Sequence, residues 1–128
     1  MIRALAALVV PLLCLTTLVL GSGAAGPAWA ADVLASAHDG YGRMVFRWDV
    51  PVRYSVEIRG EALVAEFDEP VAADVIMVPV RLSDYVEGVA RSNGKRTVSM
   101  PLKDDFTLRV FTLGNGVVID LRGGPSIA

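Results

Sequence analysis

The sequence predicts an all-β fold, a sandwich of two similar four-stranded antiparallel sheets related by internal duplication. Three observations lead to this prediction. Apolar and polar residues alternate with a period of two along most of the chain, turn-forming residues interrupt the alternation at short intervals, and the pattern repeats itself 54 positions later, where Gly40 falls on Gly94. Many short alternating segments separated by turns are typical of sandwiches and barrels.

Seven segments carry the alternation expected of half-buried strands. In the third, Tyr54, Val56 and Ile58 share one face while charged residues occupy the other. The expected strands are 33–38, 43–48, 53–59, 62–67, 96–102, 106–113 and 116–121. The turns between them are rich in Gly, Asp, Asn and Pro, among them Asp39-Gly40 and Asn93-Gly94, which favour tight hairpins.

Segment 68–86 follows neither the strand period nor the helix period, and Pro79 interrupts it. We interpret it as a crossover containing a short helical turn. It separates two half-repeats, at about 33–67 and 87–121.

The repeat extends to the positions expected in the core. Gly60 falls on Gly114, and segment 63–67 falls on 117–121, so that even the acid before the last apolar residue is shared. The matching core-type pairs are Met44 with Val98, Phe46 with Met100, Trp48 with Leu102, Val52 with Phe106, Tyr54 with Leu108, and Val56 with Val110. A regular all-β chain can match itself by accident, but 35 positions without a gap favour duplication. We expect each half to form one amphipathic sheet and the two sheets to pack face to face.

The N-terminus has the three parts of a secretory signal peptide. Arg3 is followed by the apolar segment 4–20 and by a region of small residues that ends at Ala28-Trp29-Ala30. We expect cleavage after Ala30, which leaves residues 31–128 as a single domain. A retained membrane anchor and lipidation of Cys14 are the alternatives. Pro11 within the apolar segment argues against the anchor, and the large residues before Cys14 argue against lipidation.

Charge and composition exclude several classes of function. Residues 31–128 hold 11 basic groups, all Lys and Arg except Arg3, against 14 acidic ones. An acidic domain without a basic run lacks the phosphate affinity of nucleic-acid binders. With one His, no Cys after Cys14 and no nucleophile or phosphate-loop motif, we expect no enzyme activity, no metal site and no cofactor.

Two of the strands resemble a known family. Arg43-Met44-Val45-Phe46-Arg47-Trp48 and Gly116-Val117-Val118-Ile119-Asp120-Leu121 are similar to characteristic strands of the AMIN domain. The resemblance spans about 33–121 and implies a periplasmic module of two symmetrical four-stranded sheets, found at the N-termini of cell-wall amidases and secretins and implicated in peptidoglycan binding. The segment also resembles N-terminal regions of alphaproteobacterial envelope proteins that continue into tetratricopeptide repeats. No catalytic amidase residues are present to carry over.

Candidate ligand-binding residues lie on the second expected strand and in the turn before it. Tyr41 offers a ring for stacking on a sugar, and Arg43 and Arg47 share the polar face of the strand, where a guanidinium can bind a carboxylate. With Arg53 and Arg59 they would form a cationic surface.

Each of these interpretations has a structural alternative. The arginines can instead pair across strands with Glu57 and Glu66, and Tyr41, in the turn 39–42, can fold over a sheet edge. Trp48 and Tyr54 continue apolar faces, so we expect both to be buried.

The sequence therefore predicts a non-catalytic periplasmic module that binds peptidoglycan or localises a host or partner protein to the cell envelope. After signal cleavage it has no membrane span, and nucleic acid is not a partner. The alternative is a protein-interaction module that docks a segment of an envelope protein by strand-edge pairing.

Overall fold

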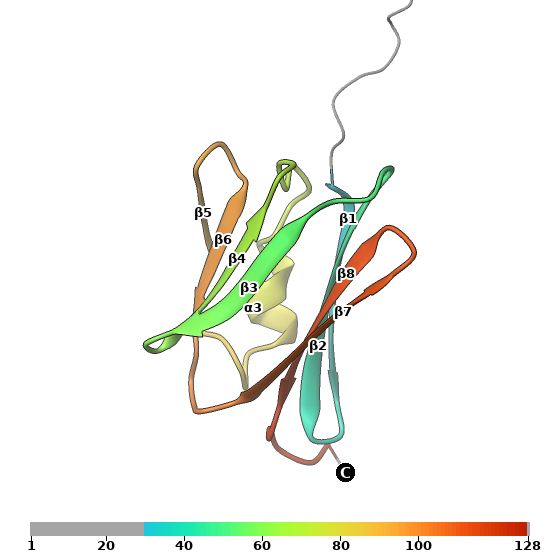
Figure 1. Ribbon diagram of the computed structural model, residues 1–128. Coiled ribbons are helices and arrows are strands. Elements are labelled where there is room, and N and C mark those ends of the chain that lie inside the picture. Colours follow the sequence, from blue (N-terminus) through green and yellow to red (C-terminus); the bar gives the residue numbers. More distant parts are fainter. Residues whose placement is uncertain (1–29, 128) are drawn as a thin grey trace, which may run out of the picture.

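The computed structural model describes residues 30–127, which form two four-stranded antiparallel sheets packed together (Figure 1). The first sheet has the order β1 (Ala30–His38), β2 (Tyr41–Trp48), β8 (Gly116–Arg122), β7 (Thr107–Leu113). The second has the order β3 (Tyr54–Arg59), β4 (Ala62–Phe67), β6 (Thr97–Pro101), β5 (Ala90–Ser92). The expected signal peptide, apart from Ala30, and Cys14 lie outside the described residues.

The all-β sandwich is confirmed, and each of the seven expected segments contains a strand. The eighth strand, β5, was not among them because it has only three residues, Ala-Arg-Ser, which is too short to show an alternating pattern. The turn glycines serve the expected purpose. Gly60 and Gly114 have φ of 62° and 61°, a left-handed conformation that glycine adopts without steric cost.

The expectation that each half of the chain forms its own sheet is wrong. Each sheet combines one hairpin from the first half with one from the second: β1 and β2 lie beside β8 and β7, and β3 and β4 lie beside β6 and β5. An isolated two-stranded hairpin is only marginally stable, and in this arrangement each hairpin pairs with a hairpin from the other half. The apolar strands β4 and β8 then lie inside their sheets, with a partner strand on each side.

The pairing registers nevertheless match at the offset of 54. Met44 pairs with Ile119 in the first sheet, and the equivalent residues Val98 and Ala65 pair in the second. Likewise β3 pairs with β4 in the register in which β7 pairs with β8. The pairing of β5 with β6 differs by two residues from that of β1 with β2, because the turn 93–96 is longer than Asp39-Gly40. The two sheets are thus equivalent in strand order and in most of their register.

The core lies between the sheets and contains most of the residues paired by the repeat. Members of both halves are buried: Met44, Phe46, Trp48, Leu63, Ala65 and Phe67 in the first, and Val98, Met100, Leu102, Val117, Ile119 and Leu121 in the second. The Trp48 ring lies 4.8 Å from that of Phe67, and its Nε1 donates a 2.9 Å hydrogen bond to the Pro70 carbonyl. The expected burial of Trp48 is confirmed. That of Tyr54 is wrong, because this residue begins the edge strand β3 and its side chain is 36% exposed.

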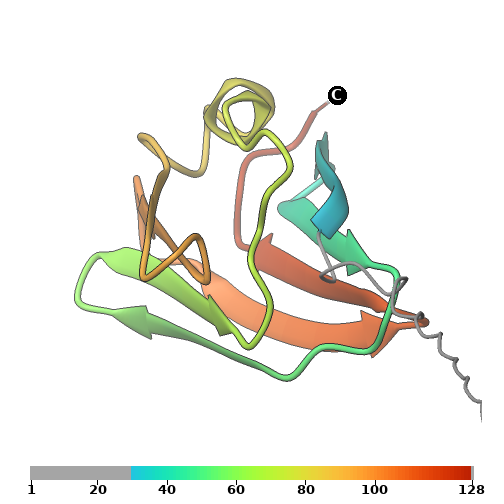
Figure 2. The same ribbon diagram turned by 90° about the horizontal axis from the view of Figure 1, so that it is seen from above.

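The crossover closes one side of the sandwich. Figure 2 shows helix α3 (Met77–Arg81) between the β1 and β5 edges of the two sheets, opposite the side where β3 and β7 run close together. Val78 and Leu82 anchor this segment in the core. No helix in the described part of the chain is long and apolar enough to cross a membrane.

Candidate functional site

The three residues predicted to bind ligand share one surface, the outer face of the sheet β1-β2-β8-β7. Along β2, Met44, Phe46 and Trp48 point into the core, so Tyr41, Arg43 and Arg47 point outward. Tyr41 is the first residue of β2, paired with His38, rather than part of the turn. We call this surface the arginine face.

A buried carboxylate lies at the centre of the arginine face. Asp120 on β8 is 0% exposed and pairs in register with Arg43 on β2 and with Arg109 on β7. Arg43 donates from Nε to Oδ1 at 2.8 Å and from Nη2 to Oδ2 at 2.9 Å, and Arg109 Nη1 lies 3.9 Å from Oδ2. The hydrogen bonds to Asp120 raise the pKa of Arg43 above its ordinary value. One carboxylate therefore orients two guanidinium groups without neutralising both.

Arginines and aromatic rings alternate across the face. The Arg122 guanidinium lies 5.5 Å from the Tyr41 ring, and Arg43 lies 5.4 Å from Tyr41 and 5.6 Å from Phe111. Arg109 lies 4.7 Å from the Phe111 ring. These are cation–π distances. The five residues form a continuous arginine–aromatic ladder, with Arg122 and Arg109 at its ends.

The hairpin of β1 and β2 fixes Tyr41, the ring beside the Arg122 end of the ladder. The rings of His38 and Tyr41 stack with centroids 4.8 Å apart and planes 12° apart, and the Ser36 hydroxyl hydrogen-bonds the His38 ring at 2.8 Å. Tyr41 is half-buried in this stack. Its ring is thus held in place while part of it stays accessible.

An apolar row runs beside the ladder. In register across the sheet lie Leu34, Val45, Val118 and Phe111, one from each strand. Val118 points outward yet is only 2% exposed, because its neighbours in the row cover it. The arginine face therefore combines this apolar row with the arginines of the ladder. Ligand sites that bind both rings and charged groups have this combination.

Positive charge is concentrated on this sheet. Its four strands hold Arg43, Arg47, Arg109 and Arg122 against Asp32 and Asp120. The other residues from 31 onward hold the remaining seven basic groups and twelve acidic ones. The arginine face is thus cationic on an acidic domain, and this asymmetry attracts anions.

The expected cationic surface of four arginines is wrong in part. Arg59 lies on β3 of the other sheet and Arg53 directly precedes that strand, and both are paired with carboxylates. Arg53 contacts Asp68 at 3.3 Å, and Arg59 contacts Glu57 and, across the strand pair, Glu66. For Arg59 the structural alternative is therefore confirmed. Arg47 is paired as well, with Asp32 at 2.9 Å, although both side chains remain about half exposed.

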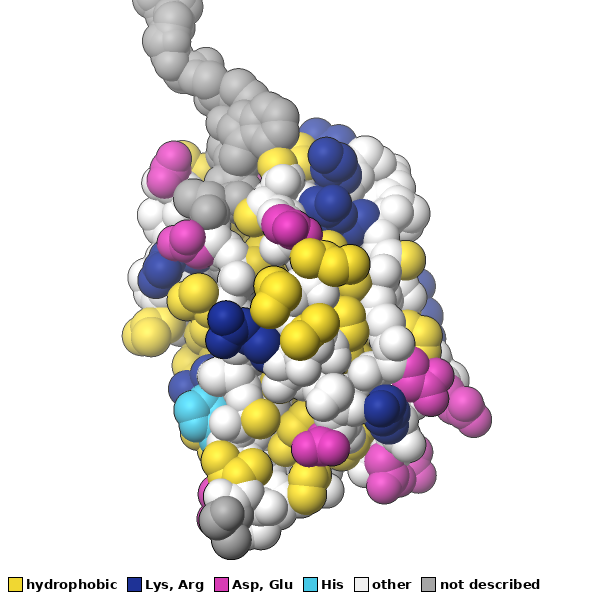
Figure 3. Space-filling model, turned by 180° about the vertical axis from the view of Figure 1, so that it is seen from behind, with side chains coloured by type: hydrophobic (Ala, Val, Ile, Leu, Met, Phe, Trp, Pro, Cys, Tyr) yellow, Lys and Arg dark blue, Asp and Glu magenta, His cyan; other side chains and the backbone are white. Residues whose placement is uncertain are grey.

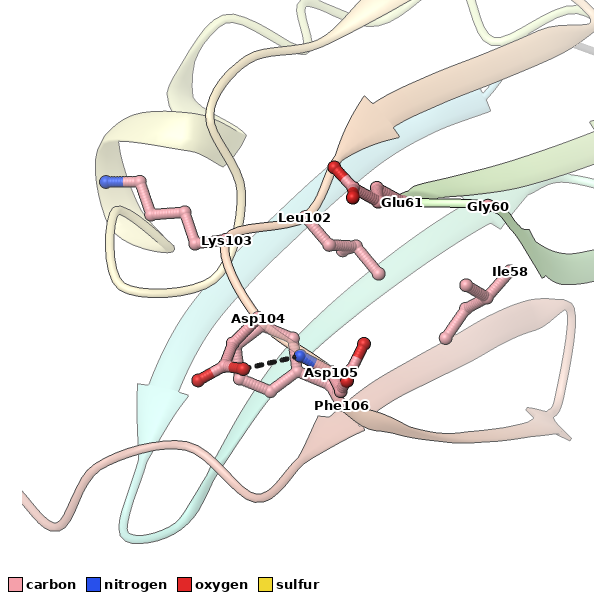
Figure 4. A pocket seen from close by; sticks show the side chains of 8 residues that line it. All are labelled: Ile58, Gly60, Glu61, Leu102, Lys103, Asp104, Asp105 and Phe106. Atoms are coloured by element: carbon pink, nitrogen blue, oxygen red, sulfur yellow. Dashed lines mark hydrogen bonds between the residues drawn. The ribbon is translucent and has the colours of Figure 1, made fainter.

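Apart from the arginine face, a hollow lies at one end of the other sheet, β3-β4-β6-β5. Figure 4 shows its lining, in which Ile58 and Leu102 point toward the hollow and Lys103 points away. Glu61, Asp104 and Asp105 are exposed on its rim, and one Asp104 oxygen accepts a 2.8 Å hydrogen bond from the Asp105 amide, as in a turn. Within the described residues no group of three or more His, Cys, Asp or Glu side chains is arranged to hold a metal ion.

Sequence reasoning missed four members of the site: Asp120, Arg109, Arg122 and Phe111. They lie on β7 and β8, and only the pairing of β8 with β2 brings them beside Arg43. The shared acid of the repeat, Asp120 in one half and Glu66 in the other, was the available signal.

Comparison with known proteins assigns no family. No protein-family model matches the chain, and no curated protein matches it. The similarity to AMIN strands therefore remains a resemblance of strand pattern.

Proposed function

We propose that the protein is a non-catalytic module of the periplasm that binds peptidoglycan through the arginine face and so localises itself, or a protein joined to it, at the cell wall. The observation that carries this proposal is the arginine–aromatic ladder on the one cationic sheet of an acidic domain.

The charge chemistry supports an anionic ligand. Peptidoglycan carries carboxylates on its stem peptides, and guanidinium groups bind carboxylates through paired hydrogen bonds. Arg43 is engaged by Asp120, whereas Arg109 is 56% exposed and only borders the same carboxylate. Arg122 forms no ion pair within the described residues and contacts the Tyr41 ring. The ends of the ladder are thus available to ligand carboxylates.

The aromatic rings support a saccharide ligand. Sugars stack their apolar faces on aromatic side chains while nearby polar groups fix their orientation. Tyr41 and Phe111 are both partly accessible, and the arginines beside them supply the polar groups. The proposal therefore keeps Tyr41, Arg43 and Arg47 and adds Arg109, Arg122 and Phe111.

The two sheets also motivate a proposal about origin. Equivalent registers at the offset of 54, with equivalent buried positions, are what duplication of a four-stranded unit with exchanged hairpins would produce. We include internal duplication and an AMIN-like architecture in the proposal on these grounds.

The experiment is co-sedimentation of the purified protein and its variants with isolated sacculi. Arg109→Ala and Arg122→Ala remove ladder ends without unpairing a buried group, so the fold should persist. Each is expected to weaken retention about tenfold, the effect of losing a charged hydrogen bond of about 1.4 kcal/mol. Tyr41→Ala tests the stacking ring. Arg43→Ala is less informative, because it leaves Asp120 buried without its main partner.

The matched control is Arg53→Ala, which removes the same charge from a side chain that is 94% exposed and belongs to the other half of the sandwich. It should bind like the unsubstituted protein. If the ladder variants, folded by circular dichroism, sediment as well as Arg53→Ala does, the arginine face is not the binding site.

A further inference from the structure

We infer that the free edge of β1, together with helix α3, forms a docking groove for an extended segment of a partner protein, which would pair as an additional strand. This groove shares Leu34 with the apolar row of the arginine face but includes none of the five ladder residues. The inference does not depend on peptidoglycan binding.

The groove runs along the backbone edge of β1. A hollow of about 240 Å³ is lined on one side by Val33, Leu34 and Ala35, and on the other by Asp74, Met77, Val78 and Arg81. Consecutive residues of a strand point to opposite faces of its sheet. A hollow that reaches three of them in succession therefore faces the edge of the strand. That edge has no strand partner within the described residues, because β1 ends its sheet.

The walls of the groove are apolar and exposed. Of the lining residues, Leu34 and Met77 are 51% and 46% exposed, and Ile76 and Val80, outside the lining but on the same segment as Met77, are exposed as well. Figure 3 looks onto the side where α3 lies and shows hydrophobic side chains gathered on that face. An accessible strand edge beside an apolar helix face is the geometry of β-strand addition, in which backbone hydrogen bonds give affinity and alternate side chains enter pockets.

Charge at the two ends of the groove specifies the occupant. Asp74 precedes α3 and accepts a 2.9 Å hydrogen bond from the Ile76 amide, and Arg81 ends the helix. Arg81 is exposed and forms no ion pair within residues 30–127. We therefore assign to the occupant an alternating apolar strand with a basic residue toward Asp74 and an acidic residue toward Arg81.

Other occupants fit less well. The β1 strand of a second copy has Asp32 and His38 at its ends, but both are engaged within their own sheet. Asp32 pairs with Arg47 at 2.9 Å, and the His38 ring stacks on Tyr41 and hydrogen-bonds with Ser36. An anionic membrane surface would be repelled by Asp74 and would leave the strand edge without backbone partners.

The test uses two labelled peptides, Lys-Val-Thr-Val-Thr-Val-Glu and its charge-exchanged form Glu-Val-Thr-Val-Thr-Val-Lys, titrated into the purified protein with binding followed by anisotropy and by amide shifts in NMR. One of the two should bind better, and which one it is depends on whether the peptide pairs parallel or antiparallel to β1. The amide shifts should concentrate at 33–35. Arg81→Glu should weaken the preferred peptide about fivefold. Met77→Ala should weaken both peptides about tenfold.

Lys103→Glu makes a similar change of charge on a residue that lines the other hollow, so it should leave both affinities unchanged. Four results would overturn the inference: no binding of either peptide, shifts confined to the β3, β5 or β7 edges, self-association that Met77→Ala abolishes, or binding of anionic vesicles in place of the peptides. Sacculus retention by Met77→Ala should match that of the unsubstituted protein, which keeps this test separate from the proposed function.

Discussion

Arg43 on β2 holds Asp120 on β8 with two parallel hydrogen bonds, although 77 residues separate them in the chain. The carboxylate is fully buried on the outer side of its sheet, where the guanidinium groups of Arg43 and Arg109 lie against it. This contact joins a strand of the first half to one of the second. It also sets the position of Arg43 between the rings of Tyr41 and Phe111.

Replacing Arg43 should therefore destabilise the fold. Arg43→Ala leaves a buried carboxylate with only Arg109 nearby, so we expect a loss of about 3 kcal/mol in the free energy of unfolding. This is the low end for breaking a buried ion pair, because Arg43 is one-third exposed.

Urea denaturation measures this loss, and Arg47→Ala is the control. Arg47 pairs with Asp32 on the same face, but that pair is exposed, so its loss should cost less than about 1 kcal/mol. Equal stabilities for the two variants would contradict the assigned role of Asp120.

Trp48 should be the most costly core residue to truncate. Its ring is buried against Phe67 and its Nε1 is hydrogen-bonded to Pro70, so Trp48→Ala should lose on the order of 3 to 5 kcal/mol. Tyr54→Ala, at a position that the repeat pairs with Leu108 but that lies on an exposed edge, should cost far less. A thermal melt of Trp48→Ala that coincides with that of the unsubstituted protein would place the ring outside the core.

Tyr85 should make stability fall at alkaline pH. Burial raises its pKa above the ordinary 10.0, with smaller contributions from Asp84 and Asp39. The unfolded chain then releases the phenolic proton near pH 10 while the folded chain retains it, so stability is complete below that pH and declines as pH rises further.

Tyr85→Phe isolates this effect. The Tyr85 hydroxyl is buried without a hydrogen-bond partner among the described residues, so removing it should leave stability at neutral pH unchanged or slightly higher. Between about pH 9 and 11 the variant should lose less stability than the unsubstituted protein. Parallel pH profiles would show that the Tyr85 phenol is not held neutral by burial.

Gly42 should resist substitution because of close packing rather than backbone conformation. A Cβ there would lie 3.0 Å from Tyr85 Cδ2 and 3.1 Å from Leu82 Cδ2, which are buried side chains of the crossover. Gly42→Ala should cost about 1 to 3 kcal/mol through overpacking. A Cβ on Gly88 would have no heavy atom within 4 Å, so Gly88→Ala is the control and should not show this loss. Calorimetry of the two variants measures the difference in the free energy of unfolding.

The fold class and most core positions could be predicted because alternation fixes which residues share a strand face. Which strands form each sheet could not be predicted. β2 pairs with β8 of the second half rather than with β4 of its own half, and no local pattern encodes this long-range pairing. The same limit applies to the site. Tyr41, Arg43 and Arg47 share a strand and were found together, whereas Arg109 and Asp120 join them only through register.

Comparing the positions 54 residues apart shows why the shared acid was an incomplete signal. Glu66 and Asp120 occupy equivalent positions, but Glu66 has Ser55 and Thr97 beside it in register and stays exposed. Asp120 has Arg109 and Arg43 at the equivalent places and is buried. The difference lies in the neighbours, which the sequence of one strand does not reveal.

The most direct test of the central claim is co-sedimentation of the purified protein with peptidoglycan sacculi, at low and moderate salt, beside a sandwich protein of similar net charge. Dextran sulfate serves as an unrelated polyanion competitor. We predict retention that persists at moderate salt and exceeds that of the control even with the competitor present, because sugar stacking adds to charge. A protein that stays in the supernatant, or that either salt or dextran sulfate releases completely, would contradict specific recognition of the cell wall by the arginine face.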